Sequence, residues 1–179
     1  MPHPLASRLG LADDDFVSTF EAAARRNFLD ANVLRRSNRR AAAIYLYGYS
    51  VEMRVKAAYF RFHFQAMGLP PGTQITGPLR DRERNAWQAI GAPWKPGHHD
   101  IEGWANLLVM KRDNLGQAYA VPFANEVTTR AARIYDNWRE YMRYRSIRVL
   151  DSEVRTVLDS EVRTVRSQAD WFRLNYHLL

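Results

Sequence analysis

The sequence predicts an all-α protein. Along most of the chain apolar residues recur at steps of three and four, the spacing that places them on one face of a helix. Turn-forming glycine and proline residues gather between these stretches, and no comparable stretch alternates apolar and polar residues as a strand would. The length of 179 residues suits one domain with its own core. We therefore expect a single domain over residues 1–179, built as an up-and-down bundle of about five helices.

The composition limits the classes of protein that remain. Hydrophobic residues make up 46% of the chain and charged residues 25%, which excludes a wholly disordered chain. The absence of cysteine excludes disulfides, thiolate nucleophiles and cysteine-ligated metals. No apolar run approaches the ~20 residues of a membrane span, and the first residues lack a signal-peptide core. We expect a cytoplasmic protein without membrane contact, in which residues 1–12 are flexible.

The first half of the chain predicts two long helices. The acidic run Asp13–Asp15 would cap the first, which ends near a polar interruption at 35–38. A longer helix runs from about Arg39 to Gln65 and is apolar on nearly every side, as a central helix with several neighbours would be. The glycines and prolines of 68–72 end it. The inward stripe of the first helix is Phe16, Phe20, Ala23, Ala24, Phe28 and Ala31.

Shorter helices are expected in the second half. One covers Leu79 to Ile90, with Trp87 and Ile90 turned inward. Asp100 has the position of an N-cap for the next helix, and Pro122 that of a first-turn proline in the one after it. The stripe of the helix after Asp100 is Ile101, Trp104, Ala105, Leu108 and Leu115. The stripe after Pro122 is Phe123, Val127, Ala131, Ile134, Trp138 and Met142.

The tail contains a tandem repeat, because LDSEVRTV occurs at 150–157 and again at 158–165. In one continuous helix an eight-residue step turns the face by about 80°, so the apolar residues still form a one-sided stripe. We interpret the repeat at 150–165 as a duplication that extends the last helix, with a hairpin of two short β segments as the alternative. A terminal helix over Ser167–Leu179 follows, and we expect 175–179 to be a frayed turn whose removal leaves the assembly and any nucleic-acid binding nearly unchanged.

Several segments resemble, in order, the HEPN domain, a small all-α family associated with nucleic acids and nucleotides. The segment Ala41–Lys56 reads AAAIYLYGYSVEMRVK and is similar to the second helix of that family. The run 98–101, His-His-Asp-Ile, resembles the stretch before its third helix, and 138–144 resembles the Trp…Arg-Tyr ending of its fourth. The likeness spans about 25–145. It implies a helical bundle, a homodimer formed through helices, and an RNA or nucleotide ligand. The matching residues of 41–56 are Gly48, Tyr49, Glu52 and Lys56.

The resemblance also bears on catalysis. Nuclease members of the HEPN family carry an arginine, four to six residues, and then a histidine, which work on RNA without a metal ion. None of the five histidines here has an arginine at that spacing. The nearest pattern is Arg173 and His177, four apart and so on one face if the helix continues. We therefore expect no catalytic residues, with a diverged metal-independent endoribonuclease using Arg173 and His177 as the alternative.

Arginine supplies most of the charge, since 26 basic residues stand against 19 acidic ones for a formal net charge of +7. Arg139 and Arg143 share a helical face, and the planar guanidinium suits phosphate. With Tyr144 they are the first ligand-binding candidates. Glu52 and Lys56 are the second, although a four-residue spacing also lets them form an ion pair between packed helices. A solvated face with ion pairs would equally account for the arginines.

No other chemistry is indicated. The adjacent His98 and His99 point in different directions and lack a second ligand cluster, so we expect no metal site. No phosphate-binding glycine loop and no serine-nucleophile motif is present, and we expect no cofactor. The leading function is a non-catalytic module that binds RNA, a nucleotide or a cognate protein partner, as an accessory factor in bacterial stress or defence. A purely structural oligomer scaffold is a further alternative.

Overall fold

A computed structural model describes residues 15–89, 100–138 and 152–179, and within these ranges the protein is all-α, as predicted. The described residues form six α-helices and no strand, where the sequence predicted about five helices. One isolated backbone bridge joins Asp15 and Ile75. In chain order the helices are α2 (Val17–Arg36), α3 (Arg40–Ala66), α4 (Gly77–Ala89), α5 (Ile101–Asn114), α6 (Val121–Asn137) and α7 (Ser152–Leu174), followed by the 3₁₀ turn η2 (Tyr176–Leu178).

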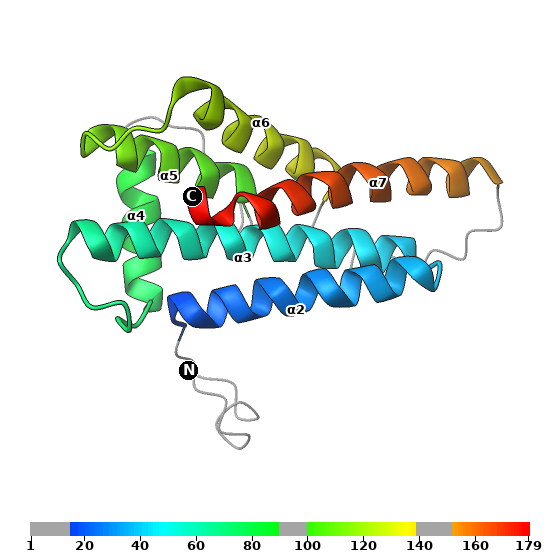
Figure 1. The fold of residues 1–179 in the computed structure, drawn as a ribbon, viewed down its shortest axis with the longest axis horizontal. Coiled ribbons are helices and arrows are strands. Elements are labelled where there is room, and N and C mark those ends of the chain that lie inside the picture. The colour runs from blue at the N-terminus through cyan, green and yellow to red at the C-terminus, as the bar shows by residue number, and fades with distance from the viewer. Residues whose placement is uncertain (1–14, 90–99, 139–151) are drawn as a thin grey trace, which may run out of the picture.

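Helix α3 is the centre of the fold (Figure 1). Helices α2 and α7 run along it, α5 and α6 also pack against it, and α4 crosses near the end of α3 that leads into the loop. Buried residues occur on all sides of α3, which confirms the central helix predicted from its apolar pattern. Among the described residues no helix is both long and apolar enough to cross a membrane.

The start of α2 differs from the prediction. Its N-cap is Phe16, which has extended backbone angles and makes no side-chain cap hydrogen bond, so the expected capping by Asp15 is wrong. Asp15 instead ties α2 to the segment before α4. Its carbonyl oxygen accepts a hydrogen bond from the backbone nitrogen of Ile75 at 2.6 Å, and its carboxylate pairs with Arg80. Asp13 and Asp14 lie outside the described residues.

The other helix ends mostly follow the sequence. Gly68, with a positive φ of 66°, follows the end of α3, and the Asp100 carboxylate accepts a hydrogen bond from the Gly103 nitrogen at 2.8 Å, which confirms the predicted cap. Pro122 lies in the first turn of α6. Leu115 was expected on the inward stripe of α5, but that helix stops at Asn114 and the Leu115 side chain is exposed.

Helix α6 ends before the predicted stripe does. Trp138 is its C-cap, with extended backbone angles of φ −116° and ψ 126°, yet the side chain is buried as expected. Met142, Ile90, the side chain of Trp87 and residues 1–12 fall outside the described part of the structure.

The repeat lies in one helix. Helix α7 is continuous from Ser152 to Leu174, so the second copy of LDSEVRTV and all but the first two residues of the first copy are helical. This confirms the helix extension and excludes the β hairpin. The helix stops earlier than predicted, since Leu174 is its last residue and a 3₁₀ turn follows.

Candidate functional site

The first binding candidates, Arg139, Arg143 and Tyr144, fall in 139–151, outside the described residues. Their placement therefore adds nothing to the site, and the binding role assigned to them stays a prediction.

The second pair, Glu52 and Lys56, lies in the interior. Both side chains are buried on α3, and the Lys56 ammonium forms an ion pair with the Glu52 carboxylate. The same ammonium lies 5.6 Å from the ring centroid of Trp104 on α5, a distance typical of a cation–π contact. The pair thus joins α3 to α5. This is the ion pair between packed helices that the four-residue spacing of Glu52 and Lys56 also allowed.

Arg173 and His177 do not share a helical face. Helix α7 ends at Leu174, and His177 lies in the 3₁₀ turn with an exposed side chain. Arg173 Nε donates a hydrogen bond to Asp170 Oδ1 at 3.2 Å. The physical reason for the difference is the tighter backbone of the turn, which changes the angle between the two positions.

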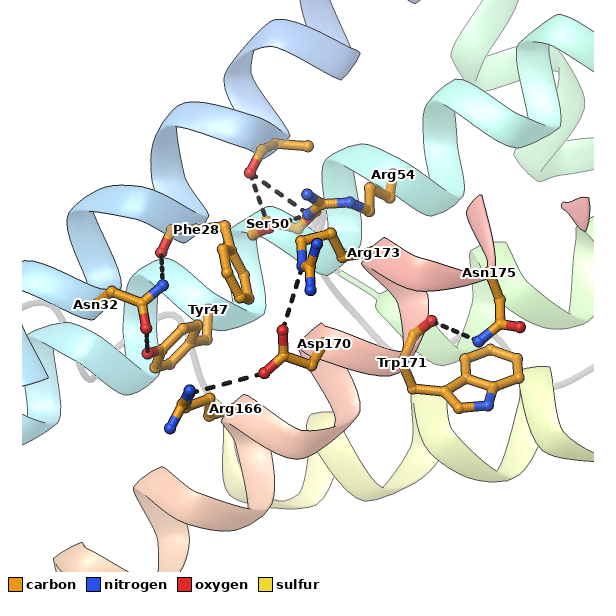
Figure 2. A network of polar contacts seen from close by, with 11 residues as sticks. Phe28, Asn32, Tyr47, Ser50, Arg54, Arg166, Asp170, Trp171, Arg173 and Asn175 are labelled. Atoms are coloured by element: carbon orange, nitrogen blue, oxygen red, sulfur yellow. Dashed lines mark hydrogen bonds and ion pairs between the residues drawn. The ribbon is translucent and has the colours of Figure 1, made fainter. Parts of the chain in front are cut away.

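Arg173 belongs instead to a cluster between three helices, which we call the arginine seam: Arg54 of α3 with Arg166, Asp170 and Arg173 of α7 (Figure 2). Asp170 lies between Arg166 and Arg173. Its Oδ2 is 3.7 Å from Arg166 Nε and its Oδ1 accepts from Arg173. One carboxylate therefore serves two guanidinium groups.

The ring of Phe28 of α2 packs against two arginines of the seam. The central carbon of the Arg54 guanidinium is 5.8 Å from the Phe28 ring centroid, and that of Arg173 is 5.4 Å from it. Figure 2 shows both arginines directed toward this ring from α3 and from α7. The aromatic ring and the neighbouring helices hold two positive charges close together.

Arg54 is the buried member of the seam, with 6% of its surface exposed. Its Nη1 donates to the Ser50 hydroxyl, to the Ser50 carbonyl at 3.1 Å and to the Ala24 carbonyl at 3.4 Å. All of these acceptors are neutral. Burial first, and the nearby charge of Arg173 second, lower the pKa of Arg54 to about 10.

Further polar side chains lie beside the arginine seam, toward the end of α2. The Tyr47 hydroxyl donates to the Asn32 side-chain oxygen at 2.9 Å, and burial raises the pKa of Tyr47 despite the nearby guanidinium groups of Arg166 and Arg35. The Nε atoms of Arg35 and Arg166 are both buried and without a hydrogen-bond acceptor in the described structure. Positive charge is in excess along this side of the fold.

Sequence reasoning missed the seam. Arg54 lies between Val51 and Val55 in a turn of α3 that also contains the charged Glu52, so nothing in the sequence distinguishes Arg54. An arginine in such a place is usually expected to extend its alkyl chain until the guanidinium group reaches solvent. The contacts that bury Arg54 include the Ala24 carbonyl and the Phe28 ring of α2, which the local pattern of α3 does not contain.

A second buried polar cluster lies where α4 crosses α3 and α5. Glu83 of α4 accepts a hydrogen bond from the Tyr59 hydroxyl and one from the Lys111 ammonium at 3.3 Å, and His63 Nδ1 is 3.5 Å from Glu83 Oε2. Sequence reasoning missed Glu83 too, because it stands among charged neighbours in RDRER.

Burial shapes the charges of this cluster. It lowers the pKa of His63, because the imidazolium form is disfavoured away from water, and it raises the pKa of Tyr59 together with the hydrogen bond to Glu83. For Glu83 burial alone would raise the pKa, but the hydrogen bond from Tyr59 and the charges of His63 and Lys111 lower it overall. The cluster links α4 to α3 and α5 inside the fold. Among the described residues no group of three or more side chains could hold a metal ion.

The exposed surface of α2 carries a different set of arginines. Arg25 and Arg26 lie in its middle, Arg36 at its end, and Arg39 in the turn before α3, and all four side chains are exposed. In the described ranges none of them forms an ion pair with an acidic side chain. We call these four residues the α2 arginine surface.

Comparison with protein-family models, with curated proteins and with solved structures finds no match for this chain.

Proposed function

We propose that the chain is a non-catalytic, HEPN-like helical module that binds RNA by contacts between its phosphates and the α2 arginine surface. The observation that carries the proposal is that four exposed arginines gather on one helix and its turn without an acidic partner in the described structure. When unpaired surface cations bind phosphates, the counterions condensed on the RNA are released, and this release drives non-specific RNA binding.

The helical geometry supports a continuous contact. Arg25 and Arg36 are eleven residues apart, so they differ by only about 20° around the helix and by roughly 16 Å along it. That separation spans more than one phosphate of an RNA strand. Arg26 lies on the other edge of the same exposed face, and the exposed Leu29 and Val33 lie between.

The resemblance to HEPN proteins supports the same class of ligand. It also implies a homodimer, whose existence light scattering on the purified protein would test. The nuclease alternative gains nothing from the geometry, because Arg173 is paired with Asp170 and His177 lies beyond the helix. The competing hypothesis is that a cognate protein partner, and not RNA, binds the α2 arginine surface.

Fluorescence anisotropy with a labelled single-stranded RNA tests the proposal. We expect binding whose affinity falls steeply with salt, with a log–log slope of about −0.7 for each phosphate contact. The variant R25Q/R36Q should reduce that slope by about 1.4. A matched control, R82Q/R84Q, removes the same charge from α4, where Arg82 pairs with Glu83 and Arg84 with Asp81.

Equal loss of affinity in both double variants would show that only net charge matters and would overturn the proposed surface. No RNA binding at low salt would overturn the function itself. RNA cleavage in EDTA that disappears in His177→Ala would establish the nuclease alternative in its place.

A further inference from the structure

The arginine seam holds more positive charge than its own carboxylate neutralises. The Asp170 carboxylate pairs with Arg166 and Arg173, whereas Arg54 bonds only to neutral acceptors, so three guanidinium groups stand against one carboxylate and leave an excess of two positive charges. The adjacent pair Arg61 and Glu21, 3.8 Å apart, is neutral in itself and does not change this balance. A buried guanidinium without a counterion is costly, since desolvation is not repaid by an opposite charge.

From this charge excess and this geometry we infer that Arg54 and Arg173 form a binding site for a phosphomonoester dianion. The site is distinct from the α2 arginine surface and does not require RNA to bind there. Its chemistry is shared by inorganic phosphate, by the terminal phosphate of a nucleotide and by a 5′-phosphorylated RNA end.

The donors available to such an anion come from both arginines. A guanidinium has five N–H donors, and the hydrogen bonds of Arg54 to described residues all come from Nη1, so Nε and Nη2 remain. Arg173 uses its Nε for Asp170, which leaves its terminal nitrogens. Paired guanidinium groups bind phosphate oxygens through short, charge-assisted hydrogen bonds.

The seam also has a route to solvent. The Arg173 side chain is 44% exposed, whereas Arg54 beneath it is only 6% exposed. The pair thus leads from the surface into a less polar interior, where an ionic contact is stronger than in water. Phe28 closes the inner side, since both guanidinium groups lie against its ring.

Charge selects the monoester over the diester. A phosphomonoester carries about −1.5 to −2 charges at neutral pH, close to the excess of two positive charges in the seam, whereas an internal RNA phosphate carries one. The site should therefore favour a terminal phosphate over the internal phosphates of an RNA strand.

Thermal unfolding of the full chain in sodium phosphate, against sodium chloride at equal ionic strength, tests the inference. Phosphate should raise the midpoint by an amount that grows with its concentration, as a ligand of the folded state does. R173Q should weaken phosphate affinity at least about tenfold. R163Q removes an exposed arginine of α7 outside the seam, bonded to the Asp159 carbonyl at 3.3 Å, and should leave the affinity unchanged.

A variant of opposite sign keeps the test independent of folding defects. D170N removes the competing carboxylate and should tighten phosphate binding. No phosphate-specific shift, or a loss in R163Q as large as in R173Q, would overturn the site. Weaker binding in D170N would overturn it as well.

Two further comparisons separate the sources of the ligand and the two proposals. A 5′-phosphorylated RNA that binds more tightly than the same strand with a 5′-hydroxyl, by a margin lost in R173Q, identifies an RNA end. Equal binding of the two strands, with the phosphate shift retained, identifies a small free phosphate ligand. R25Q/R36Q should keep the phosphate shift even where it abolishes RNA binding, so either proposal can fail alone.

Discussion

The indole ring of Trp138 lies directly against the backbone of Gly48. A Cβ atom at position 48 would be 2.2 Å from Trp138 Cδ1, far inside van der Waals contact. The indole Nε1 donates a hydrogen bond to the Tyr45 carbonyl at 2.9 Å, one turn earlier on α3. The glycine in the middle of α3 is therefore explained by a tryptophan that follows α6.

Replacing Gly48 by alanine should destabilise the fold, although alanine is the better helix former by ~1 kcal/mol. The added methyl group displaces a buried indole, and overpacking of this kind costs about 1–3 kcal/mol. Chemical denaturation would measure the change in the free energy of unfolding. Gly77→Ala, at the first residue of α4 with nothing within 4 Å, is the matched control and should be neutral or slightly stabilising.

The buried pair Glu52 and Lys56 should show strong coupling. Lys56→Met alone leaves a buried carboxylate without its partner, and we expect a loss of about 3–5 kcal/mol in the free energy of unfolding. The double variant Glu52→Gln/Lys56→Met should lose much less, because no charge remains uncompensated. Additive losses in a double-mutant cycle would contradict the ion pair seen in the structure.

Stability should fall in acid because of His63 and Glu83. Burial lowers the pKa of His63, so below about pH 6.5 the unfolded chain binds a proton that the folded chain does not. The lowered pKa of Glu83 adds stability above about pH 4.5 that is lost as the pH falls further. Both effects have the same sign, and each is worth up to about 1.4 kcal/mol per pH unit.

Urea titrations between pH 7 and 4 would measure this dependence. His63→Phe should flatten the slope between about pH 6.5 and 5, because the group that titrates there is gone. His177→Phe replaces an exposed histidine in the 3₁₀ turn and should leave the slope as it is. If both variants flatten the dependence of stability on pH equally, the effect comes from the loss of any histidine charge and not from the burial of His63.

The last residues described are part of the fold, which makes the expectation of a frayed turn wrong. The Tyr176 hydroxyl donates to Glu21 Oε1 at 2.6 Å, and the Arg61 guanidinium lies 4.6 Å from the Tyr176 ring centroid. Leu179 is only 3% exposed, and its carbonyl accepts a hydrogen bond from the Tyr119 hydroxyl at 2.6 Å. These contacts attach the turn to three helices or their flanking segments.

Removing 175–179 should therefore lower the free energy of unfolding by about 3 kcal/mol, since burial of one leucine alone contributes about 1.5–3 kcal/mol. Leu178→Ala, at an exposed position in the same turn, is the control and should change stability by less than about 0.5 kcal/mol. A truncated chain as stable as the full one would restore the frayed-turn interpretation.

Local signals predicted the helices well, because they depend on short-range chemistry. The unbroken apolar pattern of α3, the Asp100 cap and Pro122 each act within a few residues of their own helix. The errors at Asp15 and Leu174 lie at helix ends next to long-range contacts, such as the hydrogen bond between Ile75 and Asp15 and the one between Tyr176 and Glu21, which no local pattern records. The end of α5 before Leu115 is local, because the nitrogens of Leu115 and Gln117 bond to the Arg112 carbonyl and Gly116 has a positive φ of 69°.

The candidate site was harder to predict than the fold. Arg173 was singled out for the wrong neighbour, since its partner is Asp170 three residues before it and not His177. Arg54 and Glu83 are charged residues that are buried against other helices, Arg54 against α2 and Glu83 against α3 and α5. An amphipathic pattern averages over a whole helix face and cannot reveal a single buried charge.

The order of helices around α3 has a consequence for how the chain folds. Helices α2 and α3 are joined by residues 37–39 alone, so their pairing closes a short loop at a small entropic cost. Helix α7 reaches the same α3 only after more than a hundred intervening residues, as the pair Arg40 and Asp159 illustrates. Contacts of such long range form slowly, and elements that dock late also open most readily.

We therefore expect the α2–α3 hairpin to form early in folding and α7 to dock late. Amide hydrogen exchange should show α3 protected longest and α7 released at lower free energy. Arg54 and Phe28 are already in place in the hairpin, but Arg173 arrives only with α7. Because α7 supplies Arg173, the arginine seam is complete only once α7 has docked. An anion bound there would therefore stabilise the docked position of α7.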